Sequence, residues 1–181
     1  MKQNILKNYT FSIFNSKAED GITTSLKELG VKKEPIIVCV GSDLVVGDSM
    51  GPLIGTLLKR KGINAYVYGT LGNPITAKEI NYIKRYIKNV HKENDVIAID
   101  AAVGCEDDVG LIKVFNNGIK PGLGVNKNLD TIGDTSIIGI VASKSVKNYN
   151  LFNKTRLSLV YNMAEKIANA VNKYINYQTE T

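Results

Sequence analysis

The sequence has little cysteine and no tryptophan among its 181 residues. Its two cysteines, Cys39 and Cys105, are too few for a disulfide framework. Neither stands in a C-x-x-C or Cys/His spacing that is typical of zinc sites. This composition excludes a disulfide-rich secreted scaffold, and we expect a cytoplasmic protein.

Long apolar runs are also missing. No stretch approaches the roughly 20 residues that a membrane span needs, and the opening segment MKQNILKNYTFSIFNSK lacks the apolar region of a signal peptide. The formal charge of +6 comes from dispersed lysines, with three arginines in the whole chain. Nucleic-acid-binding proteins usually gather arginines and aromatic residues on one face. We therefore expect neither a membrane nor a nucleic acid as a partner.

Histidine is represented once, by His91, which follows an expected helix and precedes the strand expected over 96–99. That strand alone separates His91 from Asp100 by roughly 13 Å, at about 3.3 Å per residue. Ser/His/Asp and Cys/His mechanisms need a base beside the nucleophile. The chain therefore has no histidine for such a mechanism.

Apolar runs and helical periodicities alternate along the chain. The length and the 44% hydrophobic content suit one domain. The patterns predict strands over 36–40, 65–68, 96–99, 110–115 and 136–141. They also predict three helices. The first covers 52–61, the second begins at a capping box formed by Thr76 and Glu79, and the third follows an apolar face from Leu157 to Ile175.

Alternating strands and helices predict an α/β protein, a three-layer α/β/α sandwich with a mostly parallel central sheet of about five or six strands. We expect residues 35–175 to form a single domain. Residues 1–34 would be an N-terminal extension packed on it, with a short helix over 22–29, and residues 176–181 a tail.

Two aspartates are expected at the carboxyl edge of this sheet, where ligand sites of such folds lie. Asp48 follows the first predicted strand in the loop GSDLVVGDSMGP, and Asp100 ends the strand over 96–99. Two neighbouring carboxylates can share a water, polarise a carbonyl or hold a divalent metal. Alternatively, Asp48 is only a helix N-cap and Asp100 only caps a strand.

Glycine-rich turns surround the two aspartates and predict a close approach of backbone to a bound molecule. The loops fit neither common nucleotide-binding pattern, so a phosphate is not specifically indicated. We expect Cys39 to lie in the core, Cys105 to be a bystander, and residues 106–108 to form a solvated acidic turn. The residues that we expect to contact a substrate are Gly47, Gly69, Thr70, Lys127 and Asp134.

Several segments together resemble one family. VCVGSDLVVGDSMGPLIG, VYGTLGNP, VIAIDAAVG, KPGLGVNKNLDTIGDTSIIGIV and NKTRLSLVYNMAEKIA occur in the order found in the YyaC-type sporulation proteins of spore-forming bacteria. The resemblance covers roughly residues 35–170. That family is similar to the germination protease that degrades small acid-soluble spore proteins, and more distantly to hydrogenase maturation endopeptidases. The implied fold is therefore that of a hydrogenase maturation protease, which is phosphorylase/hydrolase-like.

The resemblance implies a sporulation- or germination-associated endopeptidase in which Asp48 and Asp100 are catalytic. It implies a peptide or spore protein as substrate and a forespore or mother-cell location. A divalent metal on the same two aspartates is open, but nickel is disfavoured because no histidine fills the third ligand position of the hydrogenase maturation enzymes. Two alternatives also remain open: an inactive relative that binds a peptide, partner or ion in the same cleft, and a homodimer through the last helix.

Overall fold

The computed structural model describes residues 6–32, 34–121, 131–144 and 155–179. The described part of the chain contains the strands β1 (Asn8–Ser12), β2 (Ile36–Cys39), β3 (Val67–Tyr68), β4 (Val96–Gly104), β5 (Leu111–Phe115) and β6 (Thr135–Ser143). Its α-helices are α1 (Ala18–Glu28), α2 (Met50–Arg60), α3 (Ile80–Val90) and α4 (Leu157–Thr179). Two short 3₁₀ helices are η1 (Val46–Ser49) and η2 (Glu106–Asp108).

The strands form one sheet in the order β1-β5-β6-β4-β2-β3. The pairs β6–β4, β4–β2 and β2–β3 are parallel, whereas β1–β5 and β5–β6 are antiparallel. The predicted α/β sandwich with a mostly parallel sheet is confirmed. The parallel half of the sheet carries the carboxyl edge at which both aspartates were expected.

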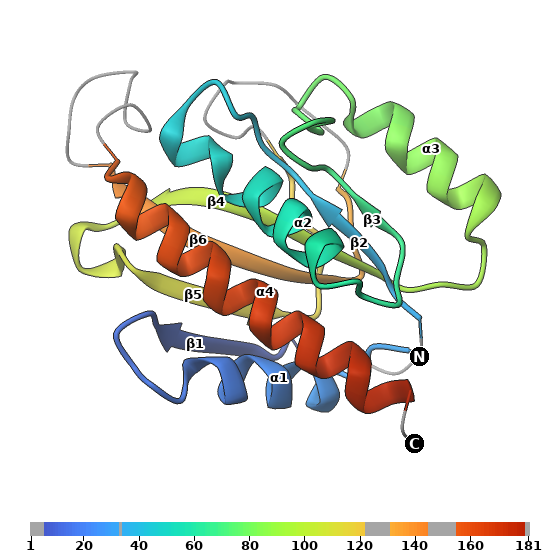
Figure 1. Cartoon of the computed structure of the whole chain (residues 1–181), viewed down its shortest axis with the longest axis horizontal. Coiled ribbons are helices and arrows are strands. Elements are labelled where there is room, and N and C mark those ends of the chain that lie inside the picture. Colours follow the sequence, from blue (N-terminus) through green and yellow to red (C-terminus); the bar gives the residue numbers. More distant parts are fainter. Residues whose placement is uncertain (1–5, 33, 122–130, 145–154, 180–181) are drawn as a thin grey trace.

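Helices cover both faces of the sheet (Figure 1). One core joins buried residues of α1, α2 and α4, such as Ile22, Ile54 and Ile167, to one sheet face. A second, smaller core packs Ile80 and Ile83 of α3 on the opposite face. The side chains of β2 therefore have helices on both sides, which explains why its four residues are all buried and all apolar apart from Cys39.

Two strands differ from the sequence prediction. β5 is antiparallel to β6, because the short link from β4 to β5 holds only η2 and cannot make the crossover that a parallel strand needs. The sequence predicts that β4 ends at Asp100. In the structure it continues to Gly104, where it still pairs with β6. The partner on its other side, β2, pairs only as far as Ile99.

The N-terminal segment is part of the sheet. β1 pairs with β5 as an edge strand, and α1 packs against α4. The Tyr174 hydroxyl of α4 donates a hydrogen bond to the main-chain oxygen of Val31 at 2.7 Å. The segment over 1–34, which we expected to pack on the domain, thus also supplies a strand and a helix to it.

Candidate active site

The carboxyl end of β2 holds the loop that carries Asp48. Gly41 has φ of +140°, and a side chain there would lie 2.1 Å from the main-chain oxygen of Asp48. Gly51, at the start of α2, lies so close to β2 that a Cβ atom would be 1.9 Å from the Val40 oxygen. Because two glycines allow this close approach, the loop folds back over the strand end and places Asp48 there.

Asp48 lies in η1, partly exposed to solvent. The N-cap residue of α2 is Ser49, and no side chain caps that helix with a hydrogen bond. The alternative role of Asp48 as a helix N-cap is therefore wrong. Burial raises the pKa of the Asp48 carboxyl, and a hydrogen bond from the Ser42 N–H acts in the opposite direction.

Asp100 lies on β4, one residue beyond the last pair that β4 makes with β2. Its Oδ1 accepts a hydrogen bond from the Ala101 N–H at 2.8 Å. Burial raises the pKa of Asp100 well above its usual range, and the negative charge of Asp48 raises it further. The two carboxyls therefore act on each other electrostatically at the end of β2.

A pair of this kind resists ionisation of both carboxyls, because two negative charges in a poorly solvated place repel each other. The more buried group, Asp100, is the one that keeps the proton as the pH rises. Asp48 ionises first. One acid and one base then stand at the same edge of the sheet, which is the arrangement that general acid–base chemistry requires.

Three of the predicted substrate residues lie at this edge of the sheet. Gly47 is buried in η1 beside Asp48. Gly69 and Thr70 follow the carboxyl end of β3, and a Cβ atom at Gly69 would lie 1.9 Å from the Cys39 oxygen of β2. Thr70 forms a tight turn with Asn73, in which each main-chain N–H donates to the other residue's oxygen.

Of the other two predicted substrate residues, the structure describes only Asp134, and it does not join the site. Asp134 lies at the amino end of β6, where its Oδ2 accepts a hydrogen bond from the Val96 N–H at 2.8 Å. That places it at the edge opposite Asp100, so the expectation that Asp134 contacts a substrate beside the two aspartates is wrong. The sequence already indicated this edge, because Asp134 directly precedes a strand of the parallel part of the sheet, as His91 does. Lys127 lies outside the described residues.

His91 lies at the C-terminal end of α3, at the amino end of β4, as the sequence predicts. The residue is buried, and its Nε2 makes a 2.7 Å hydrogen bond with the Tyr68 hydroxyl. The ring also contacts Tyr66 at a centroid distance of 4.6 Å. His91 therefore belongs to an aromatic cluster and does not face the aspartates.

The cysteines and the acidic turn occupy the places that the sequence predicts. Cys39 is buried, which raises the pKa of its thiol, and Cys105 is exposed; both are free. Asp108 of the acidic turn forms an ion pair with Lys113 at 3.4 Å. Within the described ranges, no group of three or more histidine, cysteine or acidic side chains could hold a metal. The aspartate pair offers two oxygen ligands.

Sequence reasoning missed the groove beside β3, which includes Lys59 of α2 and Tyr66. It is described below. Only a structure reveals it, since Lys59 has the pattern of an ordinary solvated lysine at a helix end. None of the described helices is both long and apolar enough to cross a membrane.

Comparisons with known proteins place the chain in a family. A family model described as "Protein of unknown function (DUF1256)" matches residues 8–170. The "Uncharacterized protein YyaC" of Bacillus subtilis (strain 168) is 38% identical over 148 residues, which cover 81% of this chain and 72% of that protein.

Among solved structures, the chain is similar to the [NiFe] hydrogenase maturation protease HycI from Thermococcus kodakarensis KOD1, with a TM-score of 0.56. The match covers 84% of this chain and 99% of the other at 18% sequence identity, which shows a shared fold. The resemblance in sequence and the match over 8–170 together identify the family: the chain belongs to the DUF1256 family, with YyaC as a relative.

Proposed function

We propose that this protein is a peptidase in which Asp48 and Asp100 together activate a water for attack on a peptide carbonyl. The observation that carries the proposal is the placement of Asp48 and Asp100 at one carboxyl edge of the sheet, where the charge of Asp48 also raises the pKa of Asp100. Perturbed carboxyl groups that lie together are typical of catalytic sites. The shared fold with a protein named as a protease supports the same class of reaction.

In the proposed mechanism, ionised Asp48 accepts a proton from the water as its oxygen attacks the carbonyl carbon. Protonated Asp100 donates a hydrogen bond to the carbonyl oxygen, and its proton then goes to the leaving amine as the C–N bond breaks. Asp48 returns the proton that it holds to Asp100, which restores the pair. A divalent metal, if one binds, would be held by Asp48 and Asp100 and would supply Lewis-acid polarisation of the carbonyl.

We propose spore proteins as the substrate class, on the family resemblance alone, and action inside the sporulating cell. The test uses the full purified chain with a small acid-soluble spore protein, and mass spectrometry to detect cleavage. We expect Asp48→Asn and Asp100→Asn each to lower the rate at least about 100-fold, the usual contribution of a general acid or base. Asp107→Asn, in the exposed turn, is the control and should cleave normally.

Unchanged cleavage by both asparagine variants would contradict the mechanism. The second candidate function is binding without catalysis, favoured because the described residues provide two acidic groups and no third ligand or histidine at the site. If the unaltered protein binds the spore protein but leaves it intact, the binding function is correct and the peptidase proposal is wrong.

A further inference from the structure

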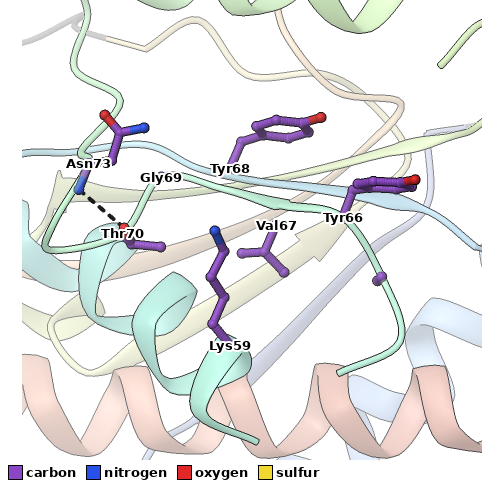
Figure 2. A pocket seen from close by; sticks show the side chains of 8 residues that line it. Lys59, Tyr66, Val67, Tyr68, Gly69, Thr70 and Asn73 are labelled. Atoms are coloured by element: carbon purple, nitrogen blue, oxygen red, sulfur yellow. Dashed lines mark hydrogen bonds between the residues drawn. The ribbon is translucent and has the colours of Figure 1, made fainter. Parts of the chain in front are cut away.

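The outer side of β3 carries a groove. β3 is the last strand of the sheet and pairs with β2 alone. Residues 65–70 line the groove in one continuous run, joined by Lys59 of α2 and by Asn73 (Figure 2). Its volume is about 360 Å³, within the usual size of ligand-binding sites, roughly 300–1,000 Å³. A groove lined by consecutive backbone residues suits a chain that runs alongside them.

The register of β3 leaves one residue with its main-chain groups turned outward. Ile37 of β2 pairs with Val67, and its N–H donates to the Tyr66 oxygen at 2.9 Å. In a parallel pair, that pattern directs the main-chain groups of Tyr66 and Tyr68 toward β2 and those of Val67 away from it. The Val67 N–H and oxygen therefore face the groove, as the donor and acceptor that an added strand would use.

The two sides of the groove differ in chemistry. Tyr66 and Tyr68 project on one side of the strand, while Lys59 rises from α2 on the other (Figure 2). The tyrosine side is fixed by ring contacts: Tyr66 with His91 at 4.6 Å, and Tyr68 with Tyr86 at 5.9 Å. Tyr66 is 63% exposed. It offers a rigid apolar surface at the groove, as aromatic residues do in binding sites.

Among the residues that the structure describes, Lys59 is the one charged residue that lines the groove. Within the described ranges, it forms no ion pair, whereas Lys32, Lys113 and Lys173 each have an aspartate partner. A lysine on an edge strand can also serve to block pairing with other chains. Lys59 projects from α2 and not from β3, so it leaves the outer side of β3 open along the groove. A strand added there would lie beside the positive charge of Lys59, which would favour acidic side chains.

We propose that this groove binds an extended acidic peptide segment, which pairs with Val67 as an added strand. Successive side chains of a strand point to opposite sides. Apolar side chains of the peptide would therefore face Tyr66 and Tyr68, and acidic ones would face Lys59. The fitting sequence alternates acidic and apolar residues.

The binding does not depend on hydrolysis by the aspartates. β3 leads into Gly69 and Thr70, at the same edge of the sheet as Asp48 and Asp100. A protein held along β3 would thus be fixed beside that edge whether or not a bond in it is cut. The tests below measure peptide binding alone. If they fail, the peptidase proposal is unaffected, and if the protein does not cleave spore proteins, the proposal of a peptide-binding groove is unaffected.

The first test measures fluorescence anisotropy with a labelled octapeptide in which glutamate and valine alternate, against one in which lysine replaces glutamate. We expect the acidic peptide to bind more tightly. Lys59→Glu should weaken acidic binding up to about fivefold, as loss of an exposed charge pair does, and favour the basic peptide. Lys61→Glu changes the net charge equally but lies outside the groove and should leave the preference unchanged.

The second test uses hydrogen exchange followed by NMR. Saturation with the acidic octapeptide should slow exchange of the Val67 amide by about tenfold, because that N–H gains an acceptor. The Tyr68 amide, which faces β2, should change little. A peptide methylated on alternate backbone nitrogens, which cannot pair as a strand on that side, should lose the effect.

Three outcomes would overturn the proposal. Equal binding of the acidic and basic peptides would mean that Lys59 does not select a partner. No binding at about 1 mM peptide, the weak end of specific affinities, would mean that Lys59 only protects the edge. Concentration-dependent dimers in sedimentation, lost on adding charge at the β3 edge, would assign the groove to a second copy of this chain.

Discussion

Buried Asp100 lowers the free energy of unfolding of this protein at pH values above the ordinary aspartate range. Its raised pKa means that, between the ordinary aspartate range and the raised value, the native state holds a proton which the unfolded state has already released. The unfolded state then binds fewer protons, so the free energy of unfolding falls as the pH rises from the ordinary aspartate range toward the raised pKa. Below both values the effect vanishes.

We therefore expect Asp100→Asn to raise the Tm at pH 7 by about 2–4 °C, the shift that 1 kcal/mol gives in a domain of this size. The rise should shrink on acidification, because protonated Asp100 and asparagine are both neutral. Circular dichroism melts at several pH values measure it. A lower Tm at pH 7 would show that the Ala101 hydrogen bond, and not the charge, dominates.

Gly51 gives a second residue-scale prediction. A methyl group there would collide with the Val40 oxygen at 1.9 Å, so Gly51→Ala should lower the free energy of unfolding by about 1–3 kcal/mol, as overpacking does. Gly72→Ala is the matched control, because nothing lies within 4 Å of a Cβ there. Denaturant unfolding compares the two. Equal stability of both variants would contradict the close approach of α2 to β2.

The sequence alone predicted that Asp48 and Asp100 lie at one edge of the sheet, but it did not indicate which of the two keeps a proton longer. Their positions follow from strand order and loop glycines, which are local patterns. The pKa shifts of Asp48 and Asp100 arise from burial and, for Asp100, from the charge of Asp48. Both causes depend on how two segments about fifty residues apart in the sequence pack together. The case of Asp134 is different: its place just before a parallel strand already indicated the amino edge, and only its partner Val96, distant in sequence, needed the structure.

At the scale of elements, the start of α3 was predictable in part. The Glu79 carboxylate accepts a hydrogen bond from the Thr76 N–H at 2.9 Å, which is one half of the predicted capping box, and the Thr76 hydroxyl holds the pKa of Glu79 below its usual value. The other half does not form, because Glu79 is itself the N-cap of α3 and its N–H donates to the main-chain oxygen of Thr76. Thr76→Ala should still cost about 1 kcal/mol of stability, the usual net value of a side-chain hydrogen bond.

The pH dependence of this cap has the opposite sign to that of Asp100. A lowered native pKa means that the stabilisation is present above the ordinary glutamate range and is lost as the pH falls through the lowered value. The difference in unfolding free energy between the protein and Thr76→Ala should therefore shrink in acid. A constant difference from neutral to acidic pH would show that the hydroxyl acts by packing instead.

The strands were less predictable than this helix. β5 has the apolar run of a strand, but its direction depends on the short link before it and on which neighbour it joins. β1 has only partial burial, with Asn8 and Thr10 exposed, so its alternation is weak. Edge strands have half the pairing partners of central strands and therefore carry a weaker pattern.

On the scale of the whole molecule, the N-terminal segment is structural. α1 lies between β1 and α4, and Ile22 is fully buried in the same core as the α4 residues Ala168 and Val171. The exposed surface of the same helix carries Asp20, paired with Lys173 at 2.6 Å. One helix thus offers a core contact and a surface ion pair, both to α4.

These two contacts should differ widely in energy. Ile22→Ala removes buried volume and should lower the free energy of unfolding by about 2–5 kcal/mol. Asp20→Asn breaks an exposed pair and should change the free energy of unfolding far less, because solvent screens that pair. Denaturant unfolding followed by one probe in α1 and one in the sheet should give coincident transitions in both variants. If Ile22→Ala instead unfolds α1 while the sheet stays intact, residues 1–34 form a separable extension and the parallel sheet folds without them.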